Sequence, residues 1–185
     1  LRPEPHELGR LRVWNDDEIA AQSGFPPHPH ADMEIITYVR TGAITHEDSM
    51  GNRGRTGAGD VQVMSAGTGV RHSEFNLEDE TTTLFQIWIE TDKPGAKPGW
   101  GMKPFPKSDR SGKFQVLASG NPDDGALDIN ADARVLGATL KAGESLTYEL
   151  AEGRRAYLVP AVGTDEPTIT VTAREDAELV MVDSR

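Results

Sequence analysis

Apolar and polar residues alternate with a period of two along much of the chain, which is the pattern of β-strands with one buried face. The clearest case is residues 82–91, and residues 33–40 are rich in the β-branched and aromatic residues that strands favour. Further runs of this kind predict strands at residues 10–14, 43–48, 60–65, 114–118, 134–141, 145–150, 156–159, 168–173 and 178–183. Because the predicted strands are short and separated by turns, the pattern indicates an all-β sandwich or barrel.

Turn-forming residues punctuate these strands. Residues 15–17 (Asn-Asp-Asp) are expected to turn the chain after its first strand, and residues 51–54 to form a hairpin turn. Residues 93–107 contain four prolines and three glycines. We therefore expect a connector there, which is ordered because Trp100 and Phe105 need a surface to pack against.

Composition narrows the possible functions. The 185 residues are 36% hydrophobic, with a formal net charge of −11 that disfavours nucleic-acid binding, since such binding needs Lys and Arg to neutralise phosphates. No apolar run approaches the ~20 residues needed to span a bilayer, so we expect no membrane insertion. The absence of cysteine excludes disulfides, thiolate nucleophiles and cysteine-based metal sites. We expect a cytoplasmic monomer.

The connector predicts a boundary near residue 105, which gives two domains, residues 1–104 and 105–185. The second domain contains no histidine, so any histidine-based metal site belongs wholly to the first. Four of the five histidines lie within residues 24–76. We expect His6, in the N-terminal arm, to be solvated, and His46 to lie on the surface or rim.

Two pairs of candidate ligands have the spacing i, i+2. His28 and His30 share a face if their segment is extended, as Pro29 between them favours, and His72 and Glu74 repeat the spacing on a later strand. On facing strands of a barrel the two pairs would converge on one point. Three neutral imidazoles and a carboxylate suit a divalent first-row transition metal better than calcium or magnesium.

A His-x-His sequence alone is often a solvated loop. The framing of this stretch by glycines at expected strand ends favours a built site instead, because tight turns need glycine. These glycines are Gly24, Gly42, Gly59 and Gly67.

The same residues carry a family resemblance. Gly24-x3-His28-x-His30-x3-Glu34-x7-Gly42 resembles the first cupin motif, and Gly59-x5-Ser65-Ala66-Gly67 followed by His72-x3-Asn76 resembles the second. Six further phrases resemble the pirin family of bicupins, namely residues 25–30, 32–38, 46–51, 64–69, 71–74 and 85–88. The resemblance is dense from residue 9 to about residue 100 and thinner from residue 114 to residue 163.

The resemblance implies two antiparallel jelly-roll β-barrels packed face to face, with metal in the N-terminal barrel alone. It implies that His28, His30, His72 and Glu74 hold the metal, with iron(II) expected and manganese, cobalt, nickel, copper or zinc as alternatives. Glu34 is a ligand in many cupins but not generally in pirins. We therefore expect Glu34 to orient an imidazole through a hydrogen bond instead.

One departure from the family concerns the C-terminal barrel. The family has a further hairpin after residue 163, where this chain has only residues 164–167 before the predicted strand at 168–173. Either the hairpin is deleted or its residues near 163–165 are missing from the sequence. We favour the second, because losing two strands would expose hydrogen-bonding groups at a sheet edge.

For function, the resemblance implies a quercetin 2,3-dioxygenase type of oxygenase that acts on a flavonol-like aromatic substrate. Glu74, or failing that Glu34, would accept the proton of the substrate hydroxyl as general base. The alternative is a non-enzymatic, redox-sensitive metal-binding regulator that acts through protein partners. A third and weaker alternative is a cupin whose metal is only structural.

Overall fold

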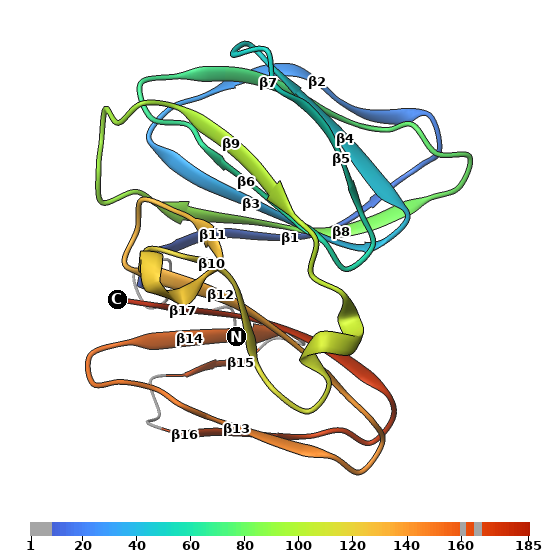
Figure 1. Cartoon of the computed structure of the whole chain (residues 1–185), viewed down its shortest axis with the longest axis vertical. Coiled ribbons are helices and arrows are strands. Elements are labelled where there is room, and N and C mark those ends of the chain that lie inside the picture. Colours follow the sequence, from blue (N-terminus) through green and yellow to red (C-terminus); the bar gives the residue numbers. More distant parts are fainter. Residues whose placement is uncertain (1–8, 160–161, 165–167) are drawn as a thin grey trace. The chain divides into compact units, whose positions relative to one another are not determined.

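The computed structural model describes residues 9–159, 162–164 and 168–185 (Figure 1). His6 lies outside the described residues, as does part of the segment where the hairpin is expected to be missing. The described chain forms two compact units. The first unit comprises Arg12–Phe105 with Ile129–Ala131, and the second unit comprises the rest. Among the described residues, no helix has both the length and the apolar character needed to cross a membrane.

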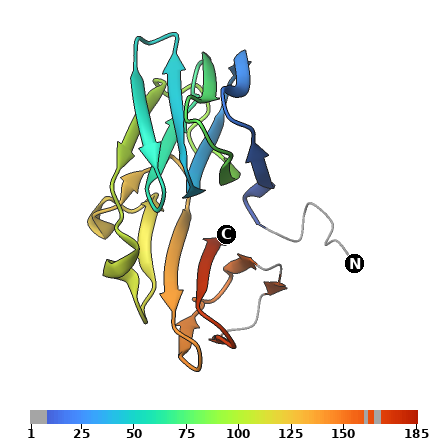
Figure 2. The same ribbon diagram turned by 90° about the vertical axis from the view of Figure 1, so that its right-hand side faces the viewer.

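The first unit consists of two β-sheets. The five-stranded sheet has the order β1 (Leu11–Ile19), β8 (Thr82–Glu90), β3 (Met33–Thr41), β6 (Val61–Ser65) and β9 (Gly99–Lys103). The four-stranded sheet has the order β2 (Ser23–His30), β7 (Val70–Asn76), β4 (Ala43–Asp48) and β5 (Arg53–Gly57). Strands β4 and β5 form an antiparallel hairpin, coloured cyan in Figure 2. The prediction of an all-β protein is confirmed.

The two sheets of the first unit face one another across a mixed core. Val39 of β3 and Ile44 of β4 belong to one buried cluster, and Ile35 of β3 and Val70 of β7 belong to another. Each cluster therefore contains residues from both sheets. Between the sheets lies a buried polar group centred on Glu74, and this group is part of the candidate site described below.

Two expectations for the first unit are wrong. Residues 15–17 do not turn the chain but continue β1, whose edge position leaves Asn15 and Asp16 exposed to water. Within the expected connector, residues 99–103 form β9, which pairs antiparallel with β6. Both errors concern edge strands, whose single pairing partner allows polar residues and nearby prolines that an interior strand would not.

Gly24, the second residue of β2, permits a close approach of two strands. A Cβ atom at this position would lie 2.2 Å from the carbonyl oxygen of Glu74 and 2.6 Å from Cα of Phe75. Both are backbone atoms of β7, so the overlap could be relieved only by moving β2 and β7 apart, and these are the strands that carry His28, His30, His72 and Glu74.

We therefore expect Gly24→Ala to lower the free energy of unfolding by about 2 kcal/mol, as overpacking does in well-packed regions. Chemical denaturation of the two proteins measures this difference. Gly99→Ala is the matched control, because Gly99 also lies in a strand but a Cβ there would meet nothing within 4 Å. Equal stability of the Gly24→Ala variant and the wild type would contradict the close approach.

The second unit has its own sheets and core. Its six-stranded sheet has the order β11 (Leu127–Asp128), β10 (Gln115–Ser119), β12 (Ala133–Leu140), β17 (Ala177–Ser184), β14 (Arg155–Val159) and β15 (Val162–Thr164). A two-stranded sheet pairs β13 (Ser145–Glu149) with β16 (Thr168–Thr172). Two short 3-10 turns are η2 (Lys107–Arg110) and η3 (Pro122–Asp124). Leu146 of β13 and Val171 of β16 pack against the buried Leu136 and Met181 of the larger sheet, so apolar side chains join the two sheets.

Candidate metal centre

Three histidines converge on the inner side of the four-stranded sheet. His28 and His30 lie on β2, and His72 lies opposite His28 on the neighbouring antiparallel strand β7. The ring centroids of His28 and His72 are 4.5 Å apart, and those of His30 and His72 are 5.0 Å apart. One ring nitrogen from each of the three residues lies within 4.8 Å of the others. The structure thus brings together three of the four predicted ligands.

The hydrogen-bond partners of these rings indicate which nitrogens are free to bind a cation. Nδ1 of His28 lies 2.8 Å from the carbonyl oxygen of Pro26. Because a carbonyl oxygen only accepts, this Nδ1 donates and Nε2 of a neutral His28 carries a lone pair. That Nε2 faces Nε2 of His72 at 3.1 Å, and Nε2 of His30 is buried without a hydrogen-bond partner in the described chain. Imidazole nitrogens that converge without protein partners fit a transition-metal ion.

The surroundings of His72 and His30 favour their neutral forms, as metal ligation requires. Burial, together with the neighbouring rings of His28, His46 and His30, lowers the pKa of His72 to about 3. Burial and the proximity of His28 also lower the pKa of His30 below its usual range. A proton therefore does not compete effectively for these nitrogens at neutral pH.

Glu74 lies beside this group, buried between the two sheets, with 1% of its surface exposed. Its Oε1 accepts hydrogen bonds from Thr37 Oγ1 at 3.0 Å and from Gln62 Nε2 at 2.6 Å, and its Oε2 accepts one from Gln86 Nε2 at 2.6 Å. Burial raises the pKa of Glu74, and the hydrogen bonds from Thr37 and Gln86 oppose that rise. A carboxylate oxygen of Glu74 and one ring nitrogen each of His72 and His46 lie within 4.8 Å of one another. Glu74 does not belong to the set formed by His28, His30 and His72.

Each of the two glutamine amides that contact Glu74 has a second hydrogen-bond partner. Thr56 Oγ1 donates to Oε1 of Gln62 at 2.9 Å, and Trp88 Nε1 donates to Oε1 of Gln86 at 3.3 Å. An indole N–H can only donate, so the carbonyl end of Gln86 must face Trp88 and its NH₂ must face Glu74. The site therefore presents hydrogen-bond donors to both carboxylate oxygens, which favours an acceptor at this position.

Glu34 lies on β3, and 1% of its surface is exposed. Its Oε2 accepts a hydrogen bond from Ser65 Oγ at 2.5 Å, and Ser65 is its partner in the pairing of β3 with β6. Within the described chain this carboxylate is tied to a hydroxyl of its own sheet. An orienting contact between Glu34 and an imidazole therefore stays a prediction.

His46 was expected on the surface or rim, and this is wrong. The residue is completely buried on β4, with Nδ1 lying 3.5 Å from Nδ1 of His72 and Nε2 lying 3.0 Å from Oδ2 of Asp48. A signal was present in the sequence, because His46 alternates in phase with Ile44, an apolar residue of the same strand. What the sequence did not supply is that β4 lies next to β7.

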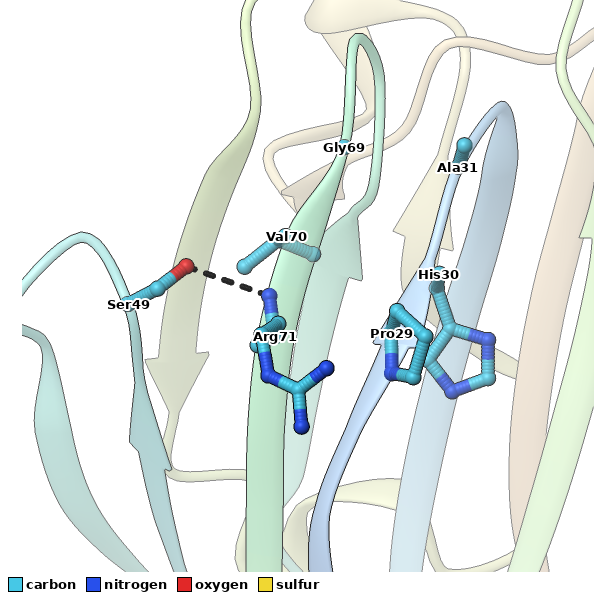
Figure 3. Close-up of a pocket in the computed structure, with 7 residues that line it drawn as sticks. All are labelled: Pro29, His30, Ala31, Ser49, Gly69, Val70 and Arg71. Carbon is cyan, nitrogen blue, oxygen red and sulfur yellow. Dashed lines mark hydrogen bonds between the residues drawn. The ribbon is translucent and has the colours of Figure 1, made fainter.

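A cavity of about 530 Å³ adjoins the site at the ends of β2 and β7 (Figure 3). It is lined by Pro29, His30, Ala31, Ser49, Gly69, Val70 and Arg71. Ser49 Oγ accepts a hydrogen bond from the backbone N–H of Arg71, and the Arg71 guanidinium donates to the carbonyl of Pro27 at 2.9 Å. Pro29 and Arg71 pair across β2 and β7 and project from the face opposite His28 and His72, so the cavity lies on the outer face of the sheet and shares only His30 with the three-histidine cluster.

An all-β unit whose facing sheets enclose converging imidazoles has the character of a cupin. Comparison with known proteins identifies the family. The profile of the Pirin family matches residues 3–89, and that of the quercetinase C-terminal cupin domain matches residues 116–166. A pirin-like protein of Caulobacter vibrioides is 63% identical over 200 residues, spanning 98% of this chain and 86% of that protein. The chain belongs to the pirin family.

Two further comparisons concern Escherichia coli. The quercetin 2,3-dioxygenase of strain K12 is 36% identical over 200 residues, spanning 97% of this chain and 85% of that protein. The crystal structure of the bacterial pirin YhhW in complex with nickel(II) matches with a TM-score of 0.83 at 33% identity, spanning 98% of this chain and 86% of that one. Both matches extend over nearly the whole chain.

Proposed function

We propose that the first unit binds one divalent transition metal and that the loaded protein is a dioxygenase acting on flavonols. The observation that carries the proposal is the convergence of three imidazoles whose Nε2 atoms face one another or lack protein partners. His28, His30 and His72 would hold the ion. Glu74 would be the fourth ligand, approaching from the side of His72. The names of the relatives support the reaction class, and the geometry supports the metal.

The donor set of three imidazoles and one carboxylate suits iron(II), which is the ion we propose. It equally accommodates nickel(II), the ion named for the related YhhW structure. When bound, the ion supplies Lewis acidity, which lowers the pKa of a coordinated substrate hydroxyl.

The residues around the site would exclude water and accept the substrate proton. Trp88 packs its ring against that of His30, with centroids 5.0 Å apart at 84°, and Met64 and Val70 are buried nearby in one apolar cluster. A carboxylate oxygen of Glu74 is the acceptor we propose for the hydroxyl proton.

The proposal predicts aerobic turnover of quercetin by protein loaded separately with iron, manganese, cobalt, nickel or copper. The loss of flavonol absorbance, together with the release of carbon monoxide, measures the reaction. His72→Ala should reduce turnover to the level of the metal-free protein, because the variant lacks a ligand from the centre of the cluster. Absence of turnover with all five metals, in protein shown to contain metal, would contradict the assignment of flavonols as substrate.

A further inference from the structure

His46 is completely buried, and it connects Asp48 to His72. Its Nε2 lies 3.0 Å from Oδ2 of Asp48, and its Nδ1 lies 3.5 Å from Nδ1 of His72. The side chains of His46 and Asp48 are 1% and 0% exposed, so bulk water does not supply alternative partners. His46 and Asp48 are two residues apart on β4 and therefore lie on the same face of the strand. Neither is among the proposed metal ligands.

The partners of Asp48 define the position of each hydrogen in this chain of contacts. Oδ1 accepts from the backbone N–H groups of Met50 at 2.9 Å and Asn52 at 3.0 Å, and Oδ2 accepts from Nδ2 of Asn52 at 2.9 Å. A carboxylate with donors on both oxygens is an acceptor toward His46 as well. Nε2 of His46 therefore carries hydrogen, and Nδ1 of a neutral His46 carries a lone pair.

The lone pair on Nδ1 of His46 in turn determines which ring nitrogen of His72 carries hydrogen. Facing an acceptor at 3.5 Å, Nδ1 of His72 is the donor of the pair. A neutral His72 with hydrogen on Nδ1 has a lone pair on Nε2, the atom that lies 3.1 Å from Nε2 of His28. The hydrogen positions thus agree along the whole chain from Asp48 to the three-histidine cluster.

We propose that Asp48 and His46 are positioning residues that determine which ring nitrogen of His72 carries hydrogen, and so keep Nε2 of His72 available to the metal. This inference rests on the metal site proposed above. It assigns to the buried Asp48–His46 pair the supporting role that carboxylates often have behind metal-binding histidines, but here transmitted through a second imidazole.

The surroundings of His46 hold its ring in the required plane. The indole of Trp100 stacks on it, with ring centroids 4.9 Å apart and an angle of 10° between the planes. Gly54 makes room for this indole, because a Cβ at Gly54 would lie 2.2 Å from Cη2 of Trp100. With its ring stacked and its two nitrogens paired, His46 has a defined orientation before any metal binds.

The change Asp48→Asn tests the proposal with almost no change in shape. The introduced amide can keep its carbonyl oxygen toward the N–H groups of Met50 and Asn52, and would then direct its NH₂ at Nε2 of His46. That donor would move the hydrogen of His46 to Nδ1 and, in turn, the hydrogen of His72 to Nε2. A comparable substitution behind the histidine of serine proteases leaves geometry intact and produces the wrong tautomer.

We expect Asp48→Asn to weaken zinc(II) and nickel(II) binding by roughly 10- to 100-fold, the usual effect of losing such a supporting contact. Competition with a chromophoric chelator measures the affinity. In a His46→Phe background, which retains an aromatic ring against Trp100, Asp48→Asn should change the affinity by less than about twofold, because the transmitting imidazole is gone. Asn52→Ala is the matched control. It removes another partner of the same carboxylate without touching His46, and should leave metal affinity near that of the wild type.

Nitrogen-15 NMR of the zinc-loaded protein gives a readout that folding stability alone would not move. We expect hydrogen on Nδ1 of His72, with a coupling across the hydrogen bond to Nδ1 of His46. Hydrogen on Nδ1 of His46 would overturn the inference. So would wild-type metal affinity in the Asp48→Asn variant, or an equal loss of affinity from Asp48→Asn with His46 present and with His46→Phe. Failure of the wild-type protein to bind either metal would instead overturn the proposed site itself.

Discussion

The double substitution His28→Ala/His30→Ala is expected to abolish tight binding of a divalent transition metal. Structural metal sites supply binding free energies of roughly 10–16 kcal/mol from about four ligands, or about 3 kcal/mol for each ligand. Losing two ligands should therefore weaken binding by roughly 10⁴-fold or more. Both imidazoles belong to β2, and their loss leaves His72 as the last histidine of the three-residue cluster. His46 remains beside His72, but its Nδ1 faces Nδ1 of His72 rather than the Nε2 that meets His28.

Metal content after purification and dialysis, together with a chelator competition, measures this loss. Ser73→Ala serves as the control, because Ser73 lies on β7 between His72 and Glu74 and points to the opposite face of the strand. The control should retain the metal content of the wild type. Undiminished metal in the double variant would refute the three-histidine site, whatever the protein catalyses.

Glu74→Gln is expected to lower the free energy of unfolding of the metal-free protein by about 3 kcal/mol. The substitution places an NH₂ group where three donors, from Thr37, Gln62 and Gln86, now point at carboxylate oxygens. Gln86 cannot turn its amide without losing its hydrogen bond from Trp88, whereas Gln62 can turn because the Thr56 hydroxyl can also accept. An introduced NH₂ that points at Gln86 would therefore face another donor, and one that points at Thr37 and Gln62 would force both of them to reverse their hydrogen bonds.

Urea denaturation of the metal-free proteins measures the difference. Glu47→Gln makes the same chemical change at an exposed position of β4 and should alter stability by less than about 0.5 kcal/mol. If Glu74→Gln were as stable as the wild type, the arrangement of donors around the Glu74 carboxylate would be wrong. A metal titration of the same variant tests Glu74 as the fourth ligand separately from its effect on stability.

The alternation of residues was a good guide to strands that have two neighbours. Residues 33–40 and 43–48 were predicted almost as the structure has β3 and β4, because both contribute a regular apolar face to the core. Edge strands were harder to predict from the sequence. Residues 15–17 and 99–103 are polar or flanked by proline, and their extended form depends on pairing with β8 and β6, distant segments of the sequence.

The candidate site, too, was predictable from the sequence only in part. The i, i+2 spacing placed His28 beside His30 on one face of a strand. That His72 joins them was expected only on the assumption that the two strands lie together in a barrel, which the family resemblance implied. His46 has no such spacing with a second ligand, so its phase with Ile44 pointed inward but nothing local indicated that it lies beside His72. Its position follows from the order of strands in the four-stranded sheet, and that order depends on contacts far apart in the chain.

The imidazoles and the donors to Glu74 come from opposite sheets of the first unit. All four buried or half-buried histidines of the site project from β2, β7 and β4, whereas the donors to Glu74 project from β3, β6 and β8. Substitutions on the five-stranded sheet can therefore change the charge and hydrogen bonding of the carboxylate while the nitrogen donors stay in place. Such substitutions would change the carboxylate that we propose as fourth ligand and proton acceptor without altering the residues that supply the imidazoles.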